Sequence, residues 1–458
     1  MEKHHHHERS TFSGKLGFVL SAAGASVGLG NIWRFPYLAA KYGGGIFLLI
    51  YIILALTFGY SMIIAETALG RMTRKSPVGA FGKFGKSKWL SFGGWINAVI
   101  PILIVPYYSV IGGWVIKYLI EYVKGNSQKL AEDGYFSAFI SDGTSTEICF
   151  LVFALLTLAI IFAGVRNGVE RVSKFMMPIL VFLSVLIAIY SVTRPGALAG
   201  VKYFLVPNPA NFSWMTVVAA MGQMFYSLSI AMGILVTFGS YMKRDVSIEG
   251  STTNVEIFDT AIAIMAGLMI IPAVFAFSGG DPDTLQAGPA LMFITIPKVF
   301  ANIGFGTPIG IIFFLLVLMA ALTSSIALTE SAVSTFQDEL RWPRKGATVI
   351  VGIIMVILGS LSSLGYGPLA FVKIIGMQFL DFFDFLTNSV MMPIAAFATC
   401  ILISRVIGVG KIEEEVEADG GSFKRKKVFR FMIRYLCPIF TVIILLSSVA
   451  NAFGWISM

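Results

Sequence analysis

The chain has 458 residues, of which 56% are hydrophobic and only 13% charged, and its mean hydropathy is +0.81. A soluble chain carries about 25% charged residues, and a compact soluble fold could not bury apolar runs that recur from one end to the other. The net charge of +9 comes from Lys and Arg in short patches between these runs, so it does not indicate nucleic-acid binding. The composition predicts an all-α polytopic membrane protein.

Histidine and cysteine indicate no metal or disulfide chemistry. The four histidines at 4–7 lie in a polar tail before Arg9, where nothing nearby would fix a metal geometry, and we interpret them as a cloning remnant or a basic tail. Cys149, Cys400 and Cys437 lie in or beside apolar stretches and form no Cys-x-x-Cys pair. The spacing therefore favours neither a disulfide framework nor a zinc site.

Eleven apolar runs are long enough to cross a membrane, since a spanning helix needs about 20 residues. The predicted spans are residues 14–38, 44–70, 90–122, 147–164, 170–191, 215–241, 257–279, 309–337, 347–364, 375–404 and 430–455. They form a single transmembrane domain, 1–458.

The connections between the spans differ in charge. Lys and Arg are concentrated in one alternate set, at 71–88, 166–174, 243–244, 341–345 and 405–430, and are sparse in the other. By the positive-inside rule this predicts a cytoplasmic N-terminus, and eleven spans then place the C-terminus outside the cell membrane. The long, semi-apolar external connection at 280–308 is predicted to dip into an outer vestibule.

The first span contains residues that do not suit an uninterrupted helix. Gly24, Gly28 and Gly30 each weaken a helix by about 1 kcal/mol relative to Ala, and Asn31 and Arg34 follow at hydrocarbon depth. A small-residue packing face would explain the first two glycines. It leaves the polar pair unexplained, and an ionisable residue inside a membrane indicates function.

The sixth span has a matching interruption. Gln223, Tyr226, Ser227, Ser229 and Gly233 fall within eleven residues of an otherwise apolar run. Spans 1 and 6 occupy corresponding positions of two five-span halves, which is typical of an inverted-repeat transporter with its binding site near the membrane midplane. Unwound backbone there is tolerated where it lines a cavity or binds a ligand.

The segment Gly28–Tyr37, Gly-Leu-Gly-Asn-Ile-Trp-Arg-Phe-Pro-Tyr, resembles the neurotransmitter:sodium symporter family, whose bacterial amino-acid transporters share the LeuT-type fold. Further matches follow in the family's order at 41–47, Glu66, 70–71, 107–108, 222–223, 322–327 and 338–340. The resemblance implies a 5+5 inverted repeat, with repeat one at about 14–191, repeat two at about 215–404 and an extra helix at 430–455. Family members commonly have twelve spans, which leaves any dimer contact through the last one, and the oligomeric state, open.

The resemblance implies two Na⁺ sites. The first would use Ser26, Asn31, Ser227 and an acidic residue of span 7, together with the substrate carboxylate. The second would use the carbonyl groups of Gly24, Val27 and Ala320 and the hydroxyl groups of Thr323 and Ser324.

The acidic ligand in span 7 has two candidate positions, Asp259 and Asn254. We prefer Asp259 because Asp-Thr-Ala-Ile-Ala matches the family's Asn-Ser-x-x-Ser segment, although a carboxylate solvated at the helix start is the alternative. A fixed negative charge beside Na⁺ would replace the chloride that animal members need. Transport is therefore predicted to be independent of chloride.

The substrate site implied by the resemblance lies between the two interrupted spans. The backbone amides of Leu29 and Gly30 and the hydroxyl of Tyr108 would hold a carboxylate beside Ser26 and Ser227. The side-chain pocket would be formed by Ile104, Tyr226, Ser229, Met232, Ser324 and Leu328. Its walls carry no charge, and Gly28 stands where monoamine carriers have an aspartate, so neutral hydrophobic or aromatic L-amino acids are the expected substrates.

Two gates follow from the same resemblance. Arg34 and Asp384 would pair on the outer side, above Tyr108 and Tyr226. A second pair, Arg9 and Asp338, supported by Tyr241, would close the cytoplasmic side. The alternative for either aspartate is a solvated charge at a helix end.

The predicted function is sodium-coupled symport of amino acids by alternating access, with the lipid bilayer and a small-molecule amino acid as partners. An intramembrane enzyme is disfavoured because the chain has neither His-Glu-x-x-His nor Gly-x-Ser-x-Gly. A channel, or a sensor that binds amino acids without coupled transport, remains the alternative.

Overall fold

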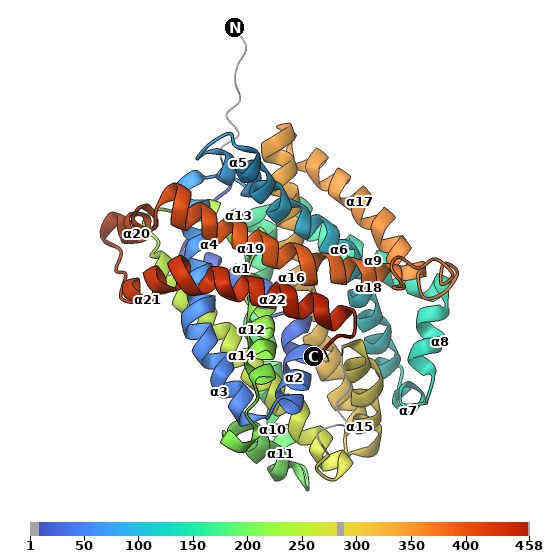
Figure 1. Ribbon diagram of the computed structural model, residues 1–458. Helices are drawn as coiled ribbons and strands as arrows, with labels where there is room; N and C mark the ends of the chain where they lie inside the picture. Colours follow the sequence, from blue (N-terminus) through green and yellow to red (C-terminus); the bar gives the residue numbers. More distant parts are fainter. Residues whose placement is uncertain (1–8, 282–287, 457–458) are drawn as a thin grey trace.

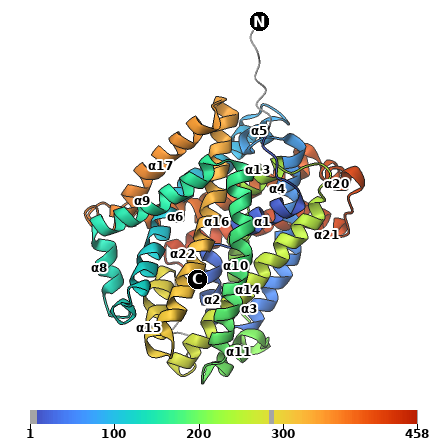
Figure 2. The same ribbon diagram turned by 180° about the vertical axis from the view of Figure 1, so that it is seen from behind.

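The computed structural model describes residues 9–281 and 288–456, and within them the chain is helical apart from connections and one isolated bridge between Ile374 and Met377 (Figure 1). The histidines at 4–7 lie outside the described residues. Figure 2 shows the same bundle from behind, with the amino-terminal end above and α11 (Ala197–Leu205) at the opposite end.

The helices of the first half are mostly long and separated by short connections. They are α1 (Lys15–Ser26), η1 (Gly30–Arg34), α2 (Phe35–Lys41), α3 (Gly45–Leu54), η2 (Ala55–Gly59), α4 (Tyr60–Thr73), α5 (Pro77–Gly82), α6 (Lys88–Val123), α7 (Ser127–Leu130), α8 (Tyr135–Ser141), α9 (Gly143–Phe162), η3 (Val165–Glu170) and α10 (Arg171–Val192).

The second half begins after α11 and the short turn η4 (Pro209–Asn211). It comprises α12 (Trp214–Ser227), α13 (Ile234–Ser240), α14 (Ile248–Ser278), η6 (Leu291–Thr295), α15 (Ile296–Asn302), α16 (Gly306–Leu340), α17 (Arg344–Leu364), α18 (Phe379–Asp384), η7 (Phe385–Met391), α19 (Met392–Ile401), η8 (Leu402–Ile407), α20 (Val409–Glu417), η9 (Ala418–Gly420), α21 (Lys426–Phe431), η10 (Met432–Leu436) and α22 (Cys437–Ala452).

The number of spans differs from the sequence-based count of eleven. Among the described residues, nine continuous helices are long and apolar enough to cross a membrane, and a tenth span is the broken pair 15–26 and 30–41, bent by 55°. The predicted sixth span, 215–241, is divided into α12 and α13, and neither half is long enough to cross alone. The count of eleven is therefore not confirmed exactly, because the sixth span, predicted to be interrupted, has a break wide enough to end one helix before the next begins.

The break between α12 and α13 is held by an unusual backbone. Ser229 and Ala231 adopt left-handed φ angles of 54° and 60°, which L-residues rarely adopt, and Gly233 follows at 70°. The Oε1 atom of Glu66 on α4 accepts a hydrogen bond of 2.8 Å from the Ala231 amide. A buried carboxyl group thus takes the place of the helical hydrogen bond that this amide has lost.

The two broken spans lie at the centre of the bundle. α1 packs against α10, α14 and α16, and α13 packs against α4 and α16. α16 also has its most extensive contact with α6. Both breaks are therefore enclosed by continuous helices, which keep lipid away from backbone groups that have no helical partner.

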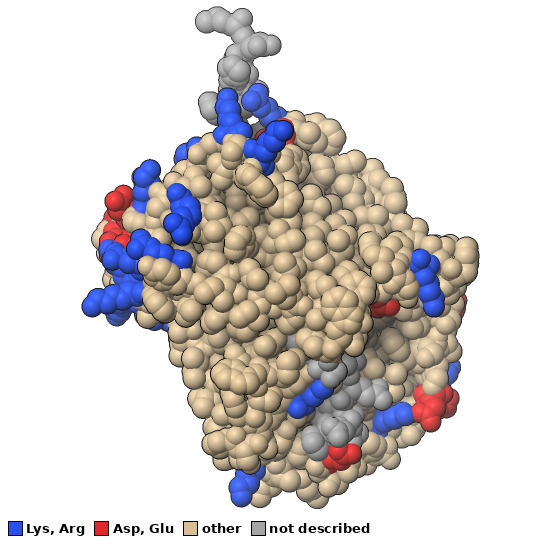
Figure 3. Space-filling model, viewed as in Figure 1, with Lys and Arg blue, Asp and Glu red and all other residues tan. Residues whose placement is uncertain are grey.

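We call the end that carries Arg9, α5 and α20 the Arg9 side. α20 is fixed there by Arg71 of α4, whose Nε lies 2.7 Å from Glu415 Oε1 and whose Nη1 donates to the Val246 carbonyl at 2.7 Å. Lys and Arg gather over α20 and α21 and near α5 in Figure 3, whereas the broad face between them is almost uncharged. This distribution matches a membrane-embedded belt below a basic end.

Candidate functional site

The two breaks face each other across a small cavity of about 30 Å³. All eleven residues predicted to bind substrate line it, namely Ser26, Leu29, Gly30, Ile104, Tyr108, Tyr226, Ser227, Ser229, Met232, Ser324 and Leu328. Ala25, Gly28, Asn31 and Ile234 complete the lining. Such a space has room for about one water molecule, so a ligand the size of an amino acid would have to displace side chains in order to bind.

Glycine is required at two positions of the η1 break because side chains approach the backbone closely. A Cβ on Gly30 would lie 2.4 Å from Tyr226 Cε1, and one on Gly28 would lie 2.7 Å from Ser324 Oγ and 3.1 Å from the Tyr108 hydroxyl. The Leu29 amide donates to that hydroxyl at 3.3 Å. Backbone donor and phenol thus converge on the cavity, as groups that bind a carboxylate would.

A buried polar cluster adjoins the cavity, centred on Asp259 of α14. Its carboxylate accepts hydrogen bonds from Asn31 Nδ2 at 2.8 Å, from Ser227 Oγ at 2.9 Å and from the Tyr51 hydroxyl at 3.1 Å. Asp259 is 0% exposed. Asn254, the other candidate from the sequence, is exposed on the same helix and lies outside this cluster.

A second set of oxygen atoms joins the α1 break to α16. Ser324 Oγ donates to the carbonyl groups of Gly24 at 3.2 Å and Val27 at 3.4 Å. Beside it, Thr323 Oγ1 lies 3.1 Å from the Ala320 carbonyl. All five groups predicted for the second ion site are buried in one place.

Both sets fit a small hard cation. Carboxylate, amide, hydroxyl and carbonyl oxygens are the ligands that hard cations prefer. The first set includes a buried carboxylate, which is costly in an apolar interior unless it is paired with positive charge. Among the described residues, Asp259 has hydrogen-bond donors around it but no cationic side chain that pairs with it. Sodium would supply the missing charge.

A larger cavity of about 400 Å³ lies beyond Tyr226, on the side away from Arg9. We call this cavity the vestibule; Arg34, Tyr226 and Asp384 line it, as do Gly288 and Pro289 of the connection at 280–308. That this connection is external stays a prediction. Tyr226 lines both cavities and separates them.

The predicted outer pair is not joined in this structure. No ion pair within 4.0 Å connects Arg34 and Asp384 among the described residues. Instead, the Arg34 guanidinium lies 5.4 Å from the centroid of the Tyr226 ring, and Asp384 Oδ1 accepts a 2.5 Å hydrogen bond from Asn388. Both charges have other partners within the vestibule, so the sequence-based pairing is not reproduced here.

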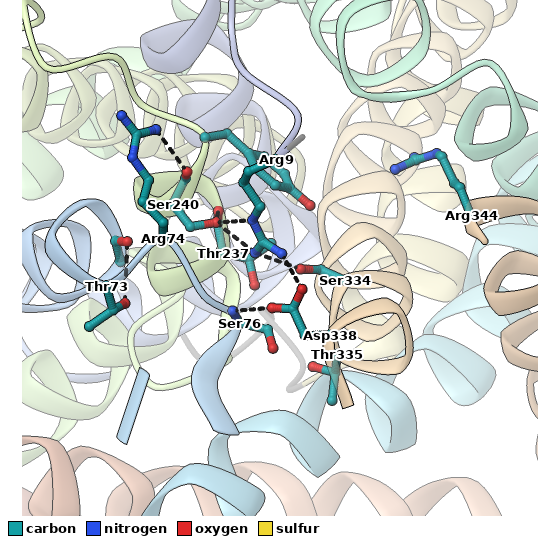
Figure 4. Close-up of polar contacts among 12 residues, drawn as sticks. Arg9, Thr73, Arg74, Ser76, Thr237, Ser240, Ser334, Thr335, Asp338 and Arg344 are labelled. Atoms are coloured by element: carbon teal, nitrogen blue, oxygen red, sulfur yellow. Dashed lines mark hydrogen bonds and ion pairs between the residues drawn. The ribbon is translucent and has the colours of Figure 1, made fainter. Parts of the chain in front are cut away.

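The predicted inner pair is joined directly (Figure 4). Arg9 Nη1 lies 2.6 Å from Asp338 Oδ1, and the same guanidinium donates to Ser240 at 2.7 Å and Ser334 at 2.9 Å. It also lies 4.9 Å from the Tyr241 ring centroid. The amino-terminal segment thereby covers the Arg9 side of α13 and α16.

Sequence reasoning missed several residues of this closure. Asp338 Oδ2 also accepts a hydrogen bond from the Ser76 amide at 2.6 Å, which adds the connection between α4 and α5 to the closure. The Tyr241 hydroxyl donates to Glu330 at 2.7 Å, and Arg344 pairs with Glu330 at 2.5 Å. The carboxylate of Glu330 inside an apolar helix was a usable signal, because such a group needs a partner.

We expect Arg9→Gln to loosen the amino-terminal segment. Charge-assisted hydrogen bonds contribute about 1.5–3 kcal/mol, so hydrogen exchange in residues 9–26 should rise by about tenfold or more. Lys15→Gln is the matched control, because Lys15 is exposed on the same segment and forms no ion pair within residues 9–281 and 288–456. Equal exchange in the two variants would contradict a closing role for Arg9.

The fold and the site together define a class of protein. The helical bundle has two interrupted central spans with a cavity between them, and the vestibule and the Arg9 closure lie on opposite sides of that cavity. This arrangement is typical of a secondary transporter. The model of the Sodium:neurotransmitter symporter family matches residues 9–131 and 136–454. The chain belongs to this family.

Individual relatives agree with this assignment. The chain is 34% identical over 445 residues to the uncharacterized sodium-dependent transporter YhdH of Bacillus subtilis, covering 96% of this chain and 97% of YhdH. It is 27% identical to the mouse sodium- and chloride-dependent GABA transporter 2, covering 90% of this chain and 75% of that protein. The crystal structure of MhsT in complex with L-phenylalanine is 35% identical, with a TM-score of 0.85 over 96% of this chain and all of that chain.

The family and the structural match confirm several predictions from the sequence. The protein is a sodium-dependent secondary transporter with the LeuT-type fold, and it is not an enzyme. Its helices make it a multi-pass membrane protein.

Proposed function

We propose that the protein imports neutral hydrophobic or aromatic L-amino acids by sodium-coupled symport and alternating access. The observation that carries the proposal is the charge-free cavity between the two broken spans. Ile104, Met232 and Leu328 form its apolar wall, and backbone amides remain for a carboxylate. Met adapts to different shapes, which favours a range of side chains over a single substrate. L-phenylalanine in the MhsT complex supports this substrate class.

The proposed coupling uses two Na⁺ ions. The Asp259 cluster borders the substrate cavity through Asn31 and Ser227, which belong to both. A substrate carboxylate there would bind the first ion directly, so each ligand raises the affinity for the other. The second ion, between α1 and α16, would stabilise the packing of the broken span.

The proposal includes orientation and architecture. The basic Arg9 side would be cytoplasmic, with the amino terminus there and the carboxyl terminus outside. The five-span halves at about 14–191 and 215–404 would be the inverted repeats, and the helix at 430–455 would lie outside them. The Arg9 and Asp338 closure and the open vestibule would then be the two gates of the transport cycle.

We also propose that transport does not need chloride. Two sodium ions and a zwitterion would leave excess positive charge in a low-dielectric site, which requires compensation. Asp259 supplies a fixed negative charge 2.8 Å from Asn31.

Uptake of radiolabelled amino acids into proteoliposomes tests the function. We expect the uptake of phenylalanine, leucine and similar amino acids to require a sodium gradient and to continue when gluconate replaces chloride. Equal uptake without sodium, or a preference for amines or charged amino acids, would overturn the proposal. Binding or counterflow without gradient-driven accumulation would favour the sensor or channel.

Thr323→Ala should weaken sodium dependence more than substrate selectivity. Its hydroxyl belongs to the proposed second ion site, and losing one such ligand should raise the half-saturating sodium concentration about tenfold. Thr329→Ala is the matched control, because Thr329 is buried on the same helix and its hydroxyl, among the described residues, bonds only to the Ser325 carbonyl. A changed substrate profile with an unchanged sodium titration would count against the assignment.

A further inference from the structure

Two arginines on the outside of the bundle have no side-chain partner in the part of the chain that the structure describes. Arg405 lies in η8, at the end of the span 379–407, and Arg434 lies in η10, within the span 426–452. Both are exposed, and neither forms a hydrogen bond or ion pair among the described residues. η8 packs against η10, so the two guanidinium groups come from neighbouring turns of adjacent helices.

Of the five acidic residues between η8 and α21, three are already engaged, whereas Glu414 and Asp419 are exposed and form no ion pair among the described residues. Glu413 accepts a 2.8 Å contact from Arg430, Glu415 is bound by Arg71, and Glu417 lies 2.9 Å from Lys426. Lys411, Lys424 and Lys427 are exposed on the same side. Figure 3 shows the resulting concentration of basic side chains over α20 and α21.

An apolar stripe begins next to each arginine and runs toward the middle of the membrane. On α19, Phe397 and Ile401 lie at four-residue intervals before Arg405 and are 39% and 37% exposed. On the neighbouring span, which runs in the opposite direction, Tyr435 of η10 and Ile439 and Leu446 of α22 follow Arg434 and are 54%, 53% and 65% exposed. The order of charge and apolar surface is therefore the same on two antiparallel helices.

This arrangement matches the shape of a phospholipid. A guanidinium group binds phosphate oxygens through a planar set of donors, and an unpaired arginine at the edge of the hydrocarbon region requires a polar or anionic partner. The exposed rings of Phe431 and Tyr435, 5.7 Å apart, lie at the same level, where aromatic residues favour the membrane interface. The stripes below offer surface for acyl chains.

We propose that Arg405 and Arg434 form a binding site for the phosphate headgroup of an anionic phospholipid, with its acyl chains along α19 and α22. The assignment of this site to the cytoplasmic leaflet rests on the orientation given under the proposed function. Anionic lipids are attracted to basic pockets between helices on that side. The lipid would therefore contact α19, in the last span of the second repeat, and α22, in the extra span that follows both repeats.

Native mass spectrometry tests this site. The full chain is reconstituted in equimolar phosphatidylglycerol and phosphatidylcholine, extracted in mild detergent, and the lipids retained by each chain are counted and titrated. We expect preferential retention of phosphatidylglycerol by the wild type. The double variant Arg405→Gln/Arg434→Gln should lower the apparent affinity for phosphatidylglycerol about thirtyfold. Each basic residue near the membrane surface contributes a similar share of the attraction to anionic lipid, and the variant removes two of them.

Two variants separate the site from bulk electrostatics and from misfolding. Arg341→Gln/Lys345→Gln removes the same charge from exposed residues on the Arg9 side but away from η8 and η10, and should leave retention unchanged. Arg405→Lys/Arg434→Lys should retain most of the preference. Equal losses in both glutamine variants, equal retention of both lipids, or displacement of the lipid by millimolar inorganic phosphate would overturn the proposal.

The readout does not depend on transport. Failure of sodium-driven uptake in the wild type would remove the proposed function while leaving lipid retention intact. Loss of the lipid preference in a wild-type protein that transports would remove only the lipid site.

Discussion

Asp259→Asn is expected to abolish chloride-independent, sodium-coupled uptake. The substitution keeps the size of the side chain and hydrogen bonds to Tyr51 and Ser227 but removes the only carboxylate in the cluster that includes Asn31. Removing one partner of a buried charge pair costs about 3–5 kcal/mol. Sodium affinity should fall by at least about a hundredfold, as measured by sodium titration of substrate binding.

Chloride distinguishes this explanation from simple loss of folding. If the negative charge is what matters, chloride should restore part of the activity of Asp259→Asn, whereas the wild type should be indifferent to gluconate replacement. Asn254→Ala is the control, because Asn254 is exposed on the same helix. Wild-type transport that stops without chloride would show that Asp259 does not compensate the bound cations.

The central site could be predicted from the sequence because its residues differ in polarity from the apolar residues around them. Glycine, amide and hydroxyl residues within otherwise apolar runs have few structural explanations, and they identified both breaks before the helices were placed. The left-handed backbone at Ser229 and Ala231 could not be predicted, because neither residue is a type that favours it. The Glu66 carboxyl, 165 residues away, stabilises that segment.

The two predicted gates show what the sequence could not predict. Arg9 and Asp338 meet as predicted, but Ser76, Ser240 and Ser334 share the same charges and carry no distinctive sequence signal. Arg34 and Asp384 were expected to pair and are separated here by contacts to Tyr226 and Asn388. Which partner a charge selects depends on tertiary geometry, and a gate must exchange partners during transport.

Gly30→Ala is expected to eliminate substrate binding through space alone. Its Cβ would lie 2.4 Å from Cε1 and 2.7 Å from Cδ1 of Tyr226, and the cavity behind that ring holds only about 30 Å³. The ring would have to move toward the vestibule or the η1 backbone away from the cavity, and either change disturbs the amides of Leu29 and Gly30 that are proposed to bind the carboxylate. Overpacking a close-fitted interior costs about 1–3 kcal/mol, and misplacing binding groups adds to this, so affinity should fall by about a hundredfold or more.

Gly222→Ala provides the matched comparison because it lies across the ring, on the vestibule side. The nearest atom to a Cβ there is Arg34 Nη2 at 3.8 Å, an ordinary contact with the end of a flexible side chain. Gly222 is helical, so alanine should if anything favour α12. Scintillation-proximity binding of labelled phenylalanine should therefore distinguish the two methyl groups: the one on the cavity side of Tyr226 lowers the affinity by about a hundredfold or more, and the one on the vestibule side leaves it within about twofold. Equal affinities would mean that the substrate does not bind between Gly30 and Tyr226.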